Sequence, residues 1–381
     1  MSARRIAVVG AGIMGLSVAW ALARRGDQVH VLDQGPIPNP LGASNDQHRL
    51  IRHAYGAERG YTRMVSAAFN AWELVWTDLG ERLYAGTGTL ALSTGAGTWL
   101  ADTQAALAAE RIPFRVLDRA TLAREFSLLD VRVVREAIHL ATGGTLFAGA
   151  IVASLARHLA ARGARIEPDG AVAEIDPERG RIVRPDGSVL ETDEIVVAAG
   201  PWTGRLLPKL AARALPSRQI VVYLDPPPET QGLWERHPMI LNLDPEAGFY
   251  LVPPRAGAGL KVGDHGFTLK GDPDREREAG AEEAAAVAGL CRTRIAGFER
   301  YRIASAKTCF YDVAPGERFI LERLGARAWV MGGFSGHGFK FAPLLGLELA
   351  RAIAGEREAG DLARWAAGRE PAAPDEIGER A

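Results

Sequence analysis

The chain has 381 residues, which is long enough for two domains of ordinary size. Its 46 acidic and 45 basic residues leave a formal net charge of −1, so the charge balance does not indicate a nucleic-acid-binding protein. No stretch reaches the roughly 20 apolar residues of a membrane span, and the two cysteines lack the spacing of a metal or redox pair. We expect a cytoplasmic, disulfide-free protein with no metal site and no nucleic-acid or membrane partner.

The first 33 residues have the pattern of a nucleotide-binding β–α–β unit. Residues 6–9 and 29–32 are short apolar strands, and residues 16–24 form a helix between them. The GAGIMG sequence at 10–15 matches G-x-G-x-x-G, in which the glycines permit a tight turn, close approach of a pyrophosphate, and close packing of helix and strand. Asp33 ends the second strand, where an acid accepts hydrogen bonds from an adenosine ribose. By itself the motif leaves FAD and NAD open.

The rest of the chain alternates between helical and strand patterns. Residues 35–60 form one long polar loop, a length that is uncommon in a compact domain unless the loop is functional. Amphipathic or alanine-rich patterns predict helices at 61–81, 98–109, 119–126, 147–161, 273–299 and 339–353. Apolar or alternating patterns predict strands at 88–92, 165–166, 172–175, 181–184, 189–191, 195–200 and 328–331, with an antiparallel sheet across 220–266. The polar tail beyond about Gly368 is predicted to be loose.

Two later segments are far more specific than the glycine motif. Residues 49–56 (RLIRHAYG) and 333–341 (GFSGHGFKF) closely resemble the monomeric sarcosine oxidase family, a branch of the D-amino-acid-oxidase-like flavoproteins. Shorter segments with counterparts in that family lie across nearly the whole chain, at 87–88, 198–202, 218–219, 260–263 and 307–309. The resemblance implies that the cofactor is FAD.

The resemblance also implies the fold class. The sequence pattern agrees with it, because a doubly wound pattern opens the chain and returns near its end. We expect an α/β plus α+β protein with a discontinuous Rossmann-like FAD domain of the glutathione-reductase type, built from residues 1–88, 143–216 and 306–381. Residues 89–142 and 217–305 would form a second, mainly antiparallel β-sheet domain that binds the substrate. The active site would lie between the two domains.

Four residues match groups that handle the substrate in this family. Arg52 and Lys340 match the pair that holds the substrate carboxylate, and a guanidinium fork with an ammonium can neutralise one carboxylate. Tyr250 and His265 match groups that line the amine pocket. The alternative for each residue is an ordinary surface cation or sheet residue.

Three residues match groups that act on the flavin or on dioxygen. Lys261 matches a lysine that activates dioxygen, where a cation would stabilise developing superoxide. Arg49 matches the residue that lies against the flavin and favours its reduced state. Cys309 matches a cysteine joined covalently to the flavin ring, so the resemblance favours a thioether, whereas a lone cysteine is otherwise usually structural.

The resemblance and the glycine motifs together predict a larger set of FAD-binding residues. The glycine-rich run at 332–338 offers backbone N–H groups and a helix N-terminus to an anionic reduced flavin, with His337 in support. The predicted set is Gly10, Gly12, Ile13, Met14, Gly15, Asp33, Gln34, Ser44, Arg49, Leu50, Val172, Ala199, Gly200, Trp202, Cys309, Gly333, Gly336, His337, Gly338, Phe339 and Lys340.

The chain departs from the family at three positions. Asn45 replaces a histidine, His48 replaces a small hydroxyl residue, and Val252 replaces an aromatic residue of the pocket. His48 is therefore predicted to bind substrate. The space beside Val252 would admit a larger N-substituent, including the second carboxylate of iminodiacetate.

We expect an FAD-dependent oxidase of a small secondary amino acid, similar to sarcosine, that forms an imine and reduces dioxygen to hydrogen peroxide. Lys261, Arg49, His265 and Tyr250 are the predicted catalytic residues. The protein is expected to be a monomer or a small homo-oligomer. The alternatives are an oxidase of iminodiacetate or another larger N-substituted glycine, a dehydrogenase of the same fold with a non-oxygen acceptor, a NAD-dependent dehydrogenase, and a non-catalytic FAD-binding subunit of a larger complex.

Overall fold

A six-stranded, mainly parallel sheet draws its strands from the start, the middle and the end of the chain in the computed structural model, which describes residues 3–243 and 248–369. Its order is β19 (Ile320–Arg323), β20 (Ala328–Gly332), β13 (Glu194–Val197), β1 (Arg5–Val9), β2 (Gln28–Leu32) and β9 (Arg165–Glu167). Neighbouring strands are parallel except for the edge pair β19 and β20. Parallel strands brought together from separated segments agree with the predicted α/β class.

Helices with apolar faces pack against this sheet and against one another. They are α1 (Ile13–Arg24), α2 (Arg59–Leu79), α5 (Ala148–Ala161), α9 (Ala342–Ile353) and α10 (Ala359–Ala366). Residues 13–22 of α1 are all buried, because the sheet lies on one side of this helix and α9 packs against it on another. A Cβ at Gly346 would lie 2.7 Å from the carbonyl oxygen of Ser17, so the glycine lets α9 approach the α1 backbone closely.

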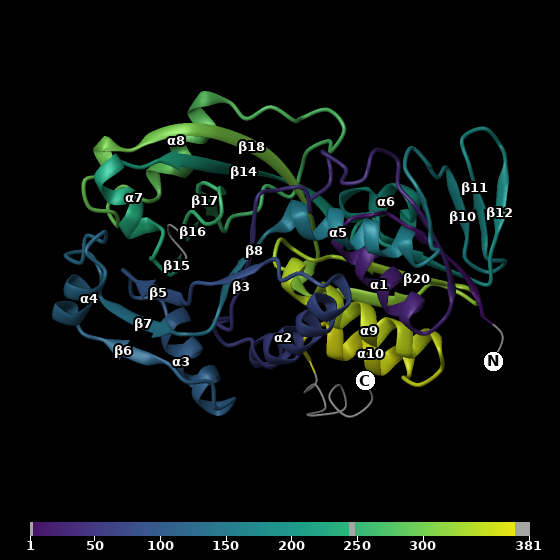
Figure 1. Cartoon of the computed structure of the whole chain (residues 1–381), viewed down its shortest axis with the longest axis horizontal. Coiled ribbons are helices and arrows are strands. Elements are labelled where there is room, and N and C mark those ends of the chain that lie inside the picture. Colours follow the sequence, from purple (N-terminus) through teal and green to yellow (C-terminus); the bar gives the residue numbers. More distant parts are fainter. Residues whose placement is uncertain (1–2, 244–247, 370–381) are drawn as a thin grey trace.

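An eight-stranded sheet forms the opposite end of the molecule (Figure 1). Its order is β18 (Arg302–Val313), β14 (Leu215–Asp225), β17 (Leu260–Asp264), β16 (Phe249–Val252), β15 (Met239–Asn242), β5 (Thr89–Ser93), β7 (Glu136–Leu140) and β6 (Arg115–Leu117). All neighbours are antiparallel except β15 and β5. The helices of this end are α3 (Trp99–Ala109), α4 (Arg119–Glu125), α7 (Pro228–Trp234) and α8 (Ala281–Gly289).

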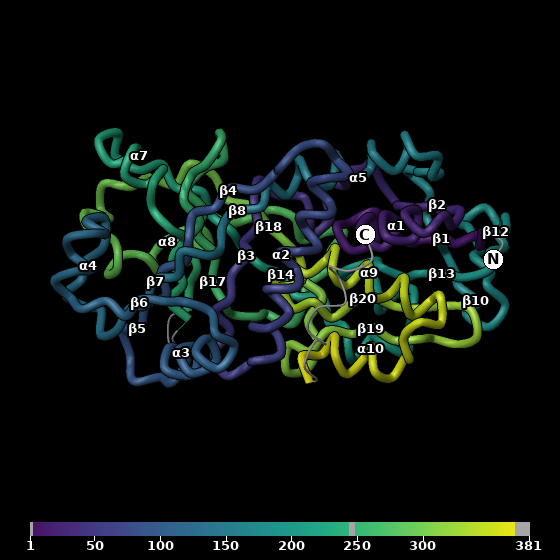
Figure 2. Tube along the Cα trace, turned by 60° about the horizontal axis from the view of Figure 1, so that its bottom comes forward, coloured from purple at the N-terminus to yellow at the C-terminus, as the bar shows by residue number. Residues whose placement is uncertain are grey.

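The two ends are joined near the middle of the long axis, where the long strands β14 and β18 and the short strand β3 lie (Figures 1 and 2). β3 (Arg49–Ile51) belongs to a small antiparallel sheet with β8 (Gly144–Leu146) and β4 (Tyr84–Gly86). A second small sheet, of β10 (Glu174–Asp176), β11 (Arg181–Val183) and β12 (Val189–Glu191), lies at the end that holds the parallel sheet. The exact domain boundaries stay a prediction.

Several predicted elements have different limits in the structure. Residues 273–299 are charged and alanine-rich, but only Ala281–Gly289 are α-helical, and the Glu283 carboxylate accepts a hydrogen bond from the Gly280 N–H at the start of this helix. The predicted loop at 35–60 contains β3, and α2 begins within it at Arg59. The helix predicted at 339–353 begins with the 3-10 turn Phe339–Phe341. The residues of the predicted loose tail beyond 369, and residues 244–247 of the predicted antiparallel sheet, lie outside the described part of the chain.

Candidate active site

A cavity of about 350 Å³ lies at the carboxyl ends of β1, β2 and β13, the edge at which open α/β sheets bind their ligands. The glycine motif forms one wall. Gly10 has a φ of +106°, and a Cβ there would lie 2.4 Å from the carbonyl oxygen of Ala198. A Cβ at Gly15 would lie 1.8 Å from the carbonyl oxygen of Gly10. Both glycines are therefore required by close backbone packing, as the motif predicts.

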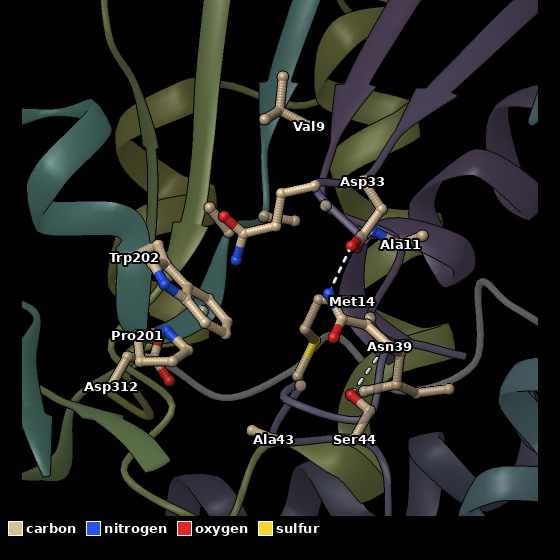
Figure 3. Close-up of a pocket in the computed structure, with 18 of the residues that line it drawn as sticks. Val9, Ala11, Met14, Asp33, Asn39, Ala43, Ser44, Pro201, Trp202 and Asp312 are labelled. Carbon is tan, nitrogen blue, oxygen red and sulfur yellow. Dashed lines mark hydrogen bonds between the residues drawn. The ribbon is translucent and has the colours of Figure 1, made fainter. Parts of the chain in front are cut away.

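Two polar side chains hold this wall in place (Figure 3). The Asp33 carboxylate accepts hydrogen bonds from the Ala11 N–H at 2.8 Å and from the Asn39 side-chain amide at 2.7 Å. The Ser44 hydroxyl oxygen accepts a hydrogen bond from the Ile13 N–H at 2.9 Å, at the start of α1. Trp202 and Asp312 lie across the cavity from them. The helix N-terminus and the glycine loop thus face a long cavity suited to a dinucleotide.

Most of the predicted FAD-binding residues line this cavity. They are Gly10, Gly12, Ile13, Met14, Asp33, Gln34, Ser44, Arg49, Val172, Ala199, Gly200, Trp202, Gly336, Gly338 and Phe339. Six others do not line it: Gly15 packs against Gly10, the Gly333 N–H donates to Asp312 at 2.7 Å, the Cys309 sulfur lies 3.8 Å from an Arg49 nitrogen, and Leu50, His337 and Lys340 line a neighbouring cavity. Their contacts with FAD stay predictions.

Asp312 is an acid of the cavity that the sequence patterns did not reveal. It stands near the end of β18 and is buried, and burial raises the pKa of its carboxyl to about 7. The chain brings it to the cavity because β18 is tied to the glycine-rich segment at two points: Val313 pairs with Phe334, and the Ala314 N–H donates to the Ser335 hydroxyl at 3.1 Å. A carboxyl with this pKa can donate a hydrogen bond to a bound group at neutral pH.

A second cavity of about 70 Å³ adjoins the first. Four residues line both cavities: Arg49, Tyr311, Gly336 and Phe339. Gly336 has a φ of +75°, and a Cβ there would lie 2.4 Å from the Tyr311 ring. The glycine therefore keeps the boundary between the two cavities narrow. The second cavity also holds the predicted residues Arg52, Tyr250, Lys261, His265 and Lys340.

Arg52 and Lys340, hereafter the open pair, come together on one aromatic ring. The guanidinium carbon of Arg52 lies 4.5 Å from the centre of the Tyr55 ring, and the ammonium of Lys340 lies 5.2 Å from the same centre. Neither cation forms an ion pair within residues 3–243 and 248–369, although both are buried. Burial lowers the pKa of both groups, and the charge of Arg52 lowers that of Lys340 further. The arrangement is suited to a carboxylate, which would supply the missing negative charge.

Tyr55, which the predictions left out, orients the open pair. Its hydroxyl oxygen accepts a hydrogen bond from the Lys340 ammonium at 2.8 Å, so its own proton is available to His337 Nδ1 at 3.2 Å. His337 Nε2 then donates to the carbonyl oxygen of Glu317 at 3.2 Å. Burial holds the pKa of His337 well below its usual range, so its ring is neutral. His337 therefore supports Lys340 through Tyr55 and does not supply a charge to the flavin.

A second group of charges, hereafter the paired cluster, consists of Asp46, Arg49, Tyr223 and Lys261. The Lys261 ammonium donates to the Asp46 carboxylate at 2.5 Å, and the Arg49 guanidinium and the Tyr223 hydroxyl donate to the same carboxylate. The Lys261 ammonium also donates to the His48 carbonyl oxygen at 3.3 Å. Lys261 is only 1% exposed. Asp46, another residue that the predictions left out, thus binds both the lysine predicted to activate dioxygen and the arginine predicted to lie against the flavin.

The charges of this cluster set one another's pKa values. Burial opposes ionisation of Asp46, but the charges of Lys261 and Arg49 outweigh burial and hold its pKa well below the usual range. Burial and the charge of Arg49 lower the pKa of Lys261 to about 8, against the attraction of Asp46. Burial also opposes the charge of Arg49, but the Asp46 carboxylate outweighs it and raises the pKa. One carboxylate therefore contacts two cations, the buried Lys261 and the half-buried Arg49, and offsets part of their charge.

The remaining wall of the second cavity is aromatic. Tyr250 lies 5.9 Å from the Lys261 ammonium, and burial raises the pKa values of both Tyr250 and Tyr311. His265 and Asp264 also line the cavity. Desolvation and the charges of Arg52 and Lys340 lower the pKa of His265 to about 4, although part of the residue is exposed to solvent. With its lowered pKa, His265 is a weak base at neutral pH, whereas burial raises the pKa of Asp264 in the same cavity.

The structure does not place His48 in either cavity. Its ring is fully buried, its Nε2 is 3.0 Å from the carbonyl oxygen of Gly259, and it stacks on Tyr223 at 6.0 Å between ring centres. Burial lowers its pKa to about 4. Its neighbour Arg49 points into the cavities instead, because adjacent residues of the strand β3 and its approach face opposite sides.

Cys309 lies beside the cavities. Its sulfur is 3.8 Å from an Arg49 nitrogen and 3.9 Å from the carbonyl oxygen of Ala43, a residue of the larger cavity. Both cysteines are free and buried. The position next to Arg49 is compatible with a bond to a flavin ring in that cavity, and the bond itself stays a prediction.

Lysine is rare in this chain, and no motif reflects this feature of the composition. The chain has five lysines, at positions 209, 261, 270, 307 and 340, among its 45 basic residues. Lys261 and Lys340 are buried at the second cavity, and Lys307 donates to the carbonyl oxygen of Asn45. Two of the five lysines thus lie at the second cavity, where burial lowers their pKa values.

Two other classes of site are not found. Within residues 3–243 and 248–369, no group of three or more His, Cys, Asp or Glu side chains is arranged to hold a metal ion. None of the helices in this described part of the chain is long and apolar enough to cross a membrane.

The family profile described as "FAD dependent oxidoreductase" matches residues 5–352. The chain is 27% identical over 363 residues to the monomeric sarcosine oxidase of Arthrobacter sp. (strain TE1826), covering 93% of each chain. It is 30% identical to the peroxisomal sarcosine oxidase of Mus musculus, covering 89% of each chain.

The fold has a counterpart in the crystal structure of L-proline dehydrogenase from P. horikoshii, with a TM-score of 0.82, 19% identity and coverage of 97% of each chain. The glycine cradle, the helix N-terminus and the cavity at the carboxyl ends of the strands fit the FAD that this family uses, and NAD is no longer an alternative. The chain belongs to the FAD-dependent oxidoreductase family, with sarcosine oxidases among its relatives and FAD as its cofactor.

Proposed function

We propose that the protein is an FAD-dependent oxidase of a small N-substituted amino acid similar to sarcosine. A secondary amine would lose two electrons and two protons to become an imine, and dioxygen would gain two electrons and two protons to become hydrogen peroxide. FAD, when bound, carries the electron pair between them. Water would then split the imine into an amine and a carbonyl compound.

The open pair is the observation that carries this proposal. Arg52 and Lys340 are buried cations without an ion-pair partner in the described residues, and they line a cavity that shares four residues with the FAD cavity. A carboxylate held there would leave the amine carbon of the substrate beside the shared wall. Holding reacting atoms about 3–3.5 Å apart is itself a large part of catalysis in such enzymes.

The other residues of the cavity support a neutral amine as the reacting form. The open pair and Lys261 make the cavity positive, which disfavours a protonated amine. His265, with a pKa of about 4, would bind as a neutral ring, and Tyr250 would offer its hydroxyl and ring face. We propose that both residues orient the amine and do not remove its proton.

The size and charge of the cavity favour a small substituent on nitrogen. The cavity volume is about 70 Å³, and Val252 lines it as expected. His48, which supported a second carboxylate, lies elsewhere, and Asp264 is the acid that lines the cavity among the described residues. A substrate such as iminodiacetate would bring its second carboxylate toward Asp264. We therefore place iminodiacetate below sarcosine and other N-methyl amino acids.

A substrate panel tests the proposal. Purified holoenzyme is given sarcosine, N-methyl-L-alanine, N-methyl-L-tryptophan, L-proline and iminodiacetate, while dioxygen consumption and peroxide are measured together. We expect the smallest N-methyl amino acids to have the highest kcat/KM, with one peroxide formed for each dioxygen consumed. Equal rates for all five compounds, or preference for iminodiacetate, would remove the cavity argument. No turnover of any compound would contradict the proposed function.

A dehydrogenase of the same fold is the second candidate, and one observation favours it. Asp46 balances part of the charge of Lys261, the residue that we expect to assist dioxygen. The panel distinguishes the two candidates if an artificial quinone is added. A dehydrogenase would reduce the quinone rapidly and form little peroxide in air, whereas an oxidase would form peroxide at a comparable rate without it.

Three further features stay predictions with simple tests. Acid precipitation of the holoenzyme would leave yellow colour in the pellet if Cys309 is joined to the flavin, and Cys309→Ser would release that colour. Gel filtration of the active protein would distinguish a monomer or small homo-oligomer from a subunit of a larger complex. A cytoplasmic location would be tested by cell fractionation.

A further inference from the structure

The paired cluster contains a charge that the proposed function does not yet use. Asp46 lies in the loop before β3, and its side chain is 2% exposed. Four donors converge on its carboxylate: the ammonium of Lys261, the guanidinium of Arg49, the hydroxyl of Tyr223, and the N–H of Gln47 at 2.8 Å. A carboxylate that accepts from four donors has little freedom to move, so it fixes its partners as well.

The geometry points to Asp46 as a positioning residue that holds Lys261 charged, and holds Lys261 and Arg49 at fixed places on the wall beside the FAD cavity. Lys261 has a side chain that is 2% exposed, and it lies on the central strand β17, so its ammonium has no access to bulk water for solvation. A buried ammonium without a carboxylate holds its proton less tightly. Arg49 lines both cavities and donates to the same carboxylate.

The groups around Lys261 come from several elements, and each acts on its charge. Arg49, from β3, repels it, while Asp46 attracts it. Cys309, from β18, acts on it from the edge of the FAD cavity, and the buried ring of His48 is close enough to be repelled by it. Tyr250, from β16, presents its ring at 5.9 Å, and Tyr223, from β14, pairs with Lys261 in the sheet register. Among these groups Asp46 is the partner in direct ion-pair contact with Lys261.

The charge of Lys261 would affect the step in which dioxygen reoxidises the flavin. This inference rests on the proposed function only in taking Lys261 as the cation that assists dioxygen. With Asp46 present, the pKa of Lys261 is about 8, so Lys261 keeps its proton below that pH. Without the carboxylate, the repulsion by Arg49 and burial act alone, and the proton is lost at lower pH. Asp46 would thus extend the pH range in which a cation faces dioxygen.

The small number of lysines permits a direct test that needs no turnover. Holoenzyme labelled with 13C- and 15N-lysine has five side-chain signals, which Lys261→Met and Lys340→Met variants would assign. In the native protein we expect the Lys261 signal to titrate near pH 8. In Asp46→Asn we expect its proton affinity to fall at least tenfold, which is one pKa unit. Asp27→Asn removes another buried carboxylate, which pairs with Arg4 far from the site, and should leave the Lys261 titration unchanged.

The pH dependence of flavin reoxidation by dioxygen gives the second readout. The rate should decline as pH rises through the pKa of Lys261, and the decline should begin at lower pH in Asp46→Asn. Asp46→Glu should restore part of the range, because it returns the carboxylate. In a Lys261→Met background, Asp46→Asn should no longer move the profile.

The proposal is overturned if Asp46→Asn leaves the Lys261 titration unchanged, or if Asp46→Asn moves the reoxidation profile equally without Lys261. If Asp46→Asn fails to fold, Asp46→Glu takes its place: its displaced carboxylate should move the Lys261 titration below pH 8, and an unchanged titration would overturn the proposal. A protein that oxidises no N-substituted amino acid, yet has the expected Lys261 titration, would contradict the proposed function and leave the role of Asp46 intact.

Discussion

The open pair and the paired cluster are built from the same residue types and line the same cavity, yet they have opposite electrostatic character. Each contains one arginine and one lysine, Arg52 with Lys340 and Arg49 with Lys261. The paired cluster has the Asp46 carboxylate between its cations, whereas the open pair has the neutral Tyr55. The comparison teaches that the uncompensated charge, and not the mere presence of cations, indicates where the ligand carboxylate binds.

The difference has an energetic side. A buried cation without a partner loses the hydration it had in water, so the open pair destabilises the ligand-free fold. A ligand carboxylate would remove this penalty on binding. In the paired cluster the compensation is internal, so the cluster is stable without ligand but depends on every member. Each of the following changes tests one side of this contrast.

The largest expected effect is on stability, from removing the shared carboxylate of the paired cluster. Asp46→Asn would leave Lys261 and Arg49 buried without their partner, and breaking such a pair costs about 3–5 kcal/mol. Urea unfolding of holoenzyme and variant measures the loss. Asp27→Asn, which removes a carboxylate paired with the partly exposed Arg4, should cost much less. Equal losses for the two variants would mean that the paired cluster is not a special charge balance.

The next effect is on substrate use, from truncating the open pair. Arg52→Ala would remove a bidentate donor of the carboxylate, and a lost buried charge contact of about 3 kcal/mol corresponds to roughly a 100-fold decrease in kcat/KM. Arg52→Lys keeps the charge but loses the two-pronged guanidinium, so its kcat/KM should lie between those of the native protein and of Arg52→Ala. Steady-state kinetics with the best substrate of the panel measures both. An unchanged kcat/KM in Arg52→Ala would exclude the open pair as the carboxylate site.

A smaller effect is expected on the pH dependence of carboxylate binding. Burial and Arg52 hold the pKa of Lys340 well below its usual range in the free protein, and a bound carboxylate would raise it again. At pH values between the Lys340 pKa of the free protein and that of the complex, binding therefore takes up a proton. In this range the affinity for the carboxylate should fall by up to about tenfold for each unit that the pH rises. Titration of the flavin absorbance with acetate at several pH values measures the slope. A slope of zero in the native protein, or the same slope in Lys340→Met, would contradict this role of Lys340.

The smallest expected effect is a gain in stability without ligand. Lys340→Met removes an unpaired buried charge and fills similar space, so we expect the free energy of unfolding to rise by about 1 kcal/mol. Because the pKa of Lys340 is lowered in the folded protein, the unfolded chain binds this proton more tightly. The free energy of unfolding of the native protein therefore rises with pH between the folded and unfolded pKa values of Lys340. The variant lacks this pH dependence. Thermal melts at two pH values measure both. Lys261→Met, in which Asp46 loses its partner, should instead be destabilised.

The sequence by itself determined the cofactor and much of the cavity that holds it. The glycines at 10, 12 and 15, the acid at 33 and the segments at 49–56 and 333–341 act through local backbone geometry or short, specific strings. Local geometry can be predicted because it depends on neighbours in the chain. Arg52 and Lys340 were found in the same way, through strings that resemble a known family.

The tertiary structure decided which of these charges are compensated. Asp46 is 215 residues from Lys261, Tyr55 is 285 residues from Lys340, and no motif relates them. His48 was expected in the substrate cavity from its position in the chain, but strand alternation turns its ring away and the neighbouring Arg49 inward. Charge balance is a property of distances between folded segments, and it depends on burial that the folded chain alone creates. The cations can therefore be predicted from the sequence, whereas the fold determines which of them are free to bind a substrate.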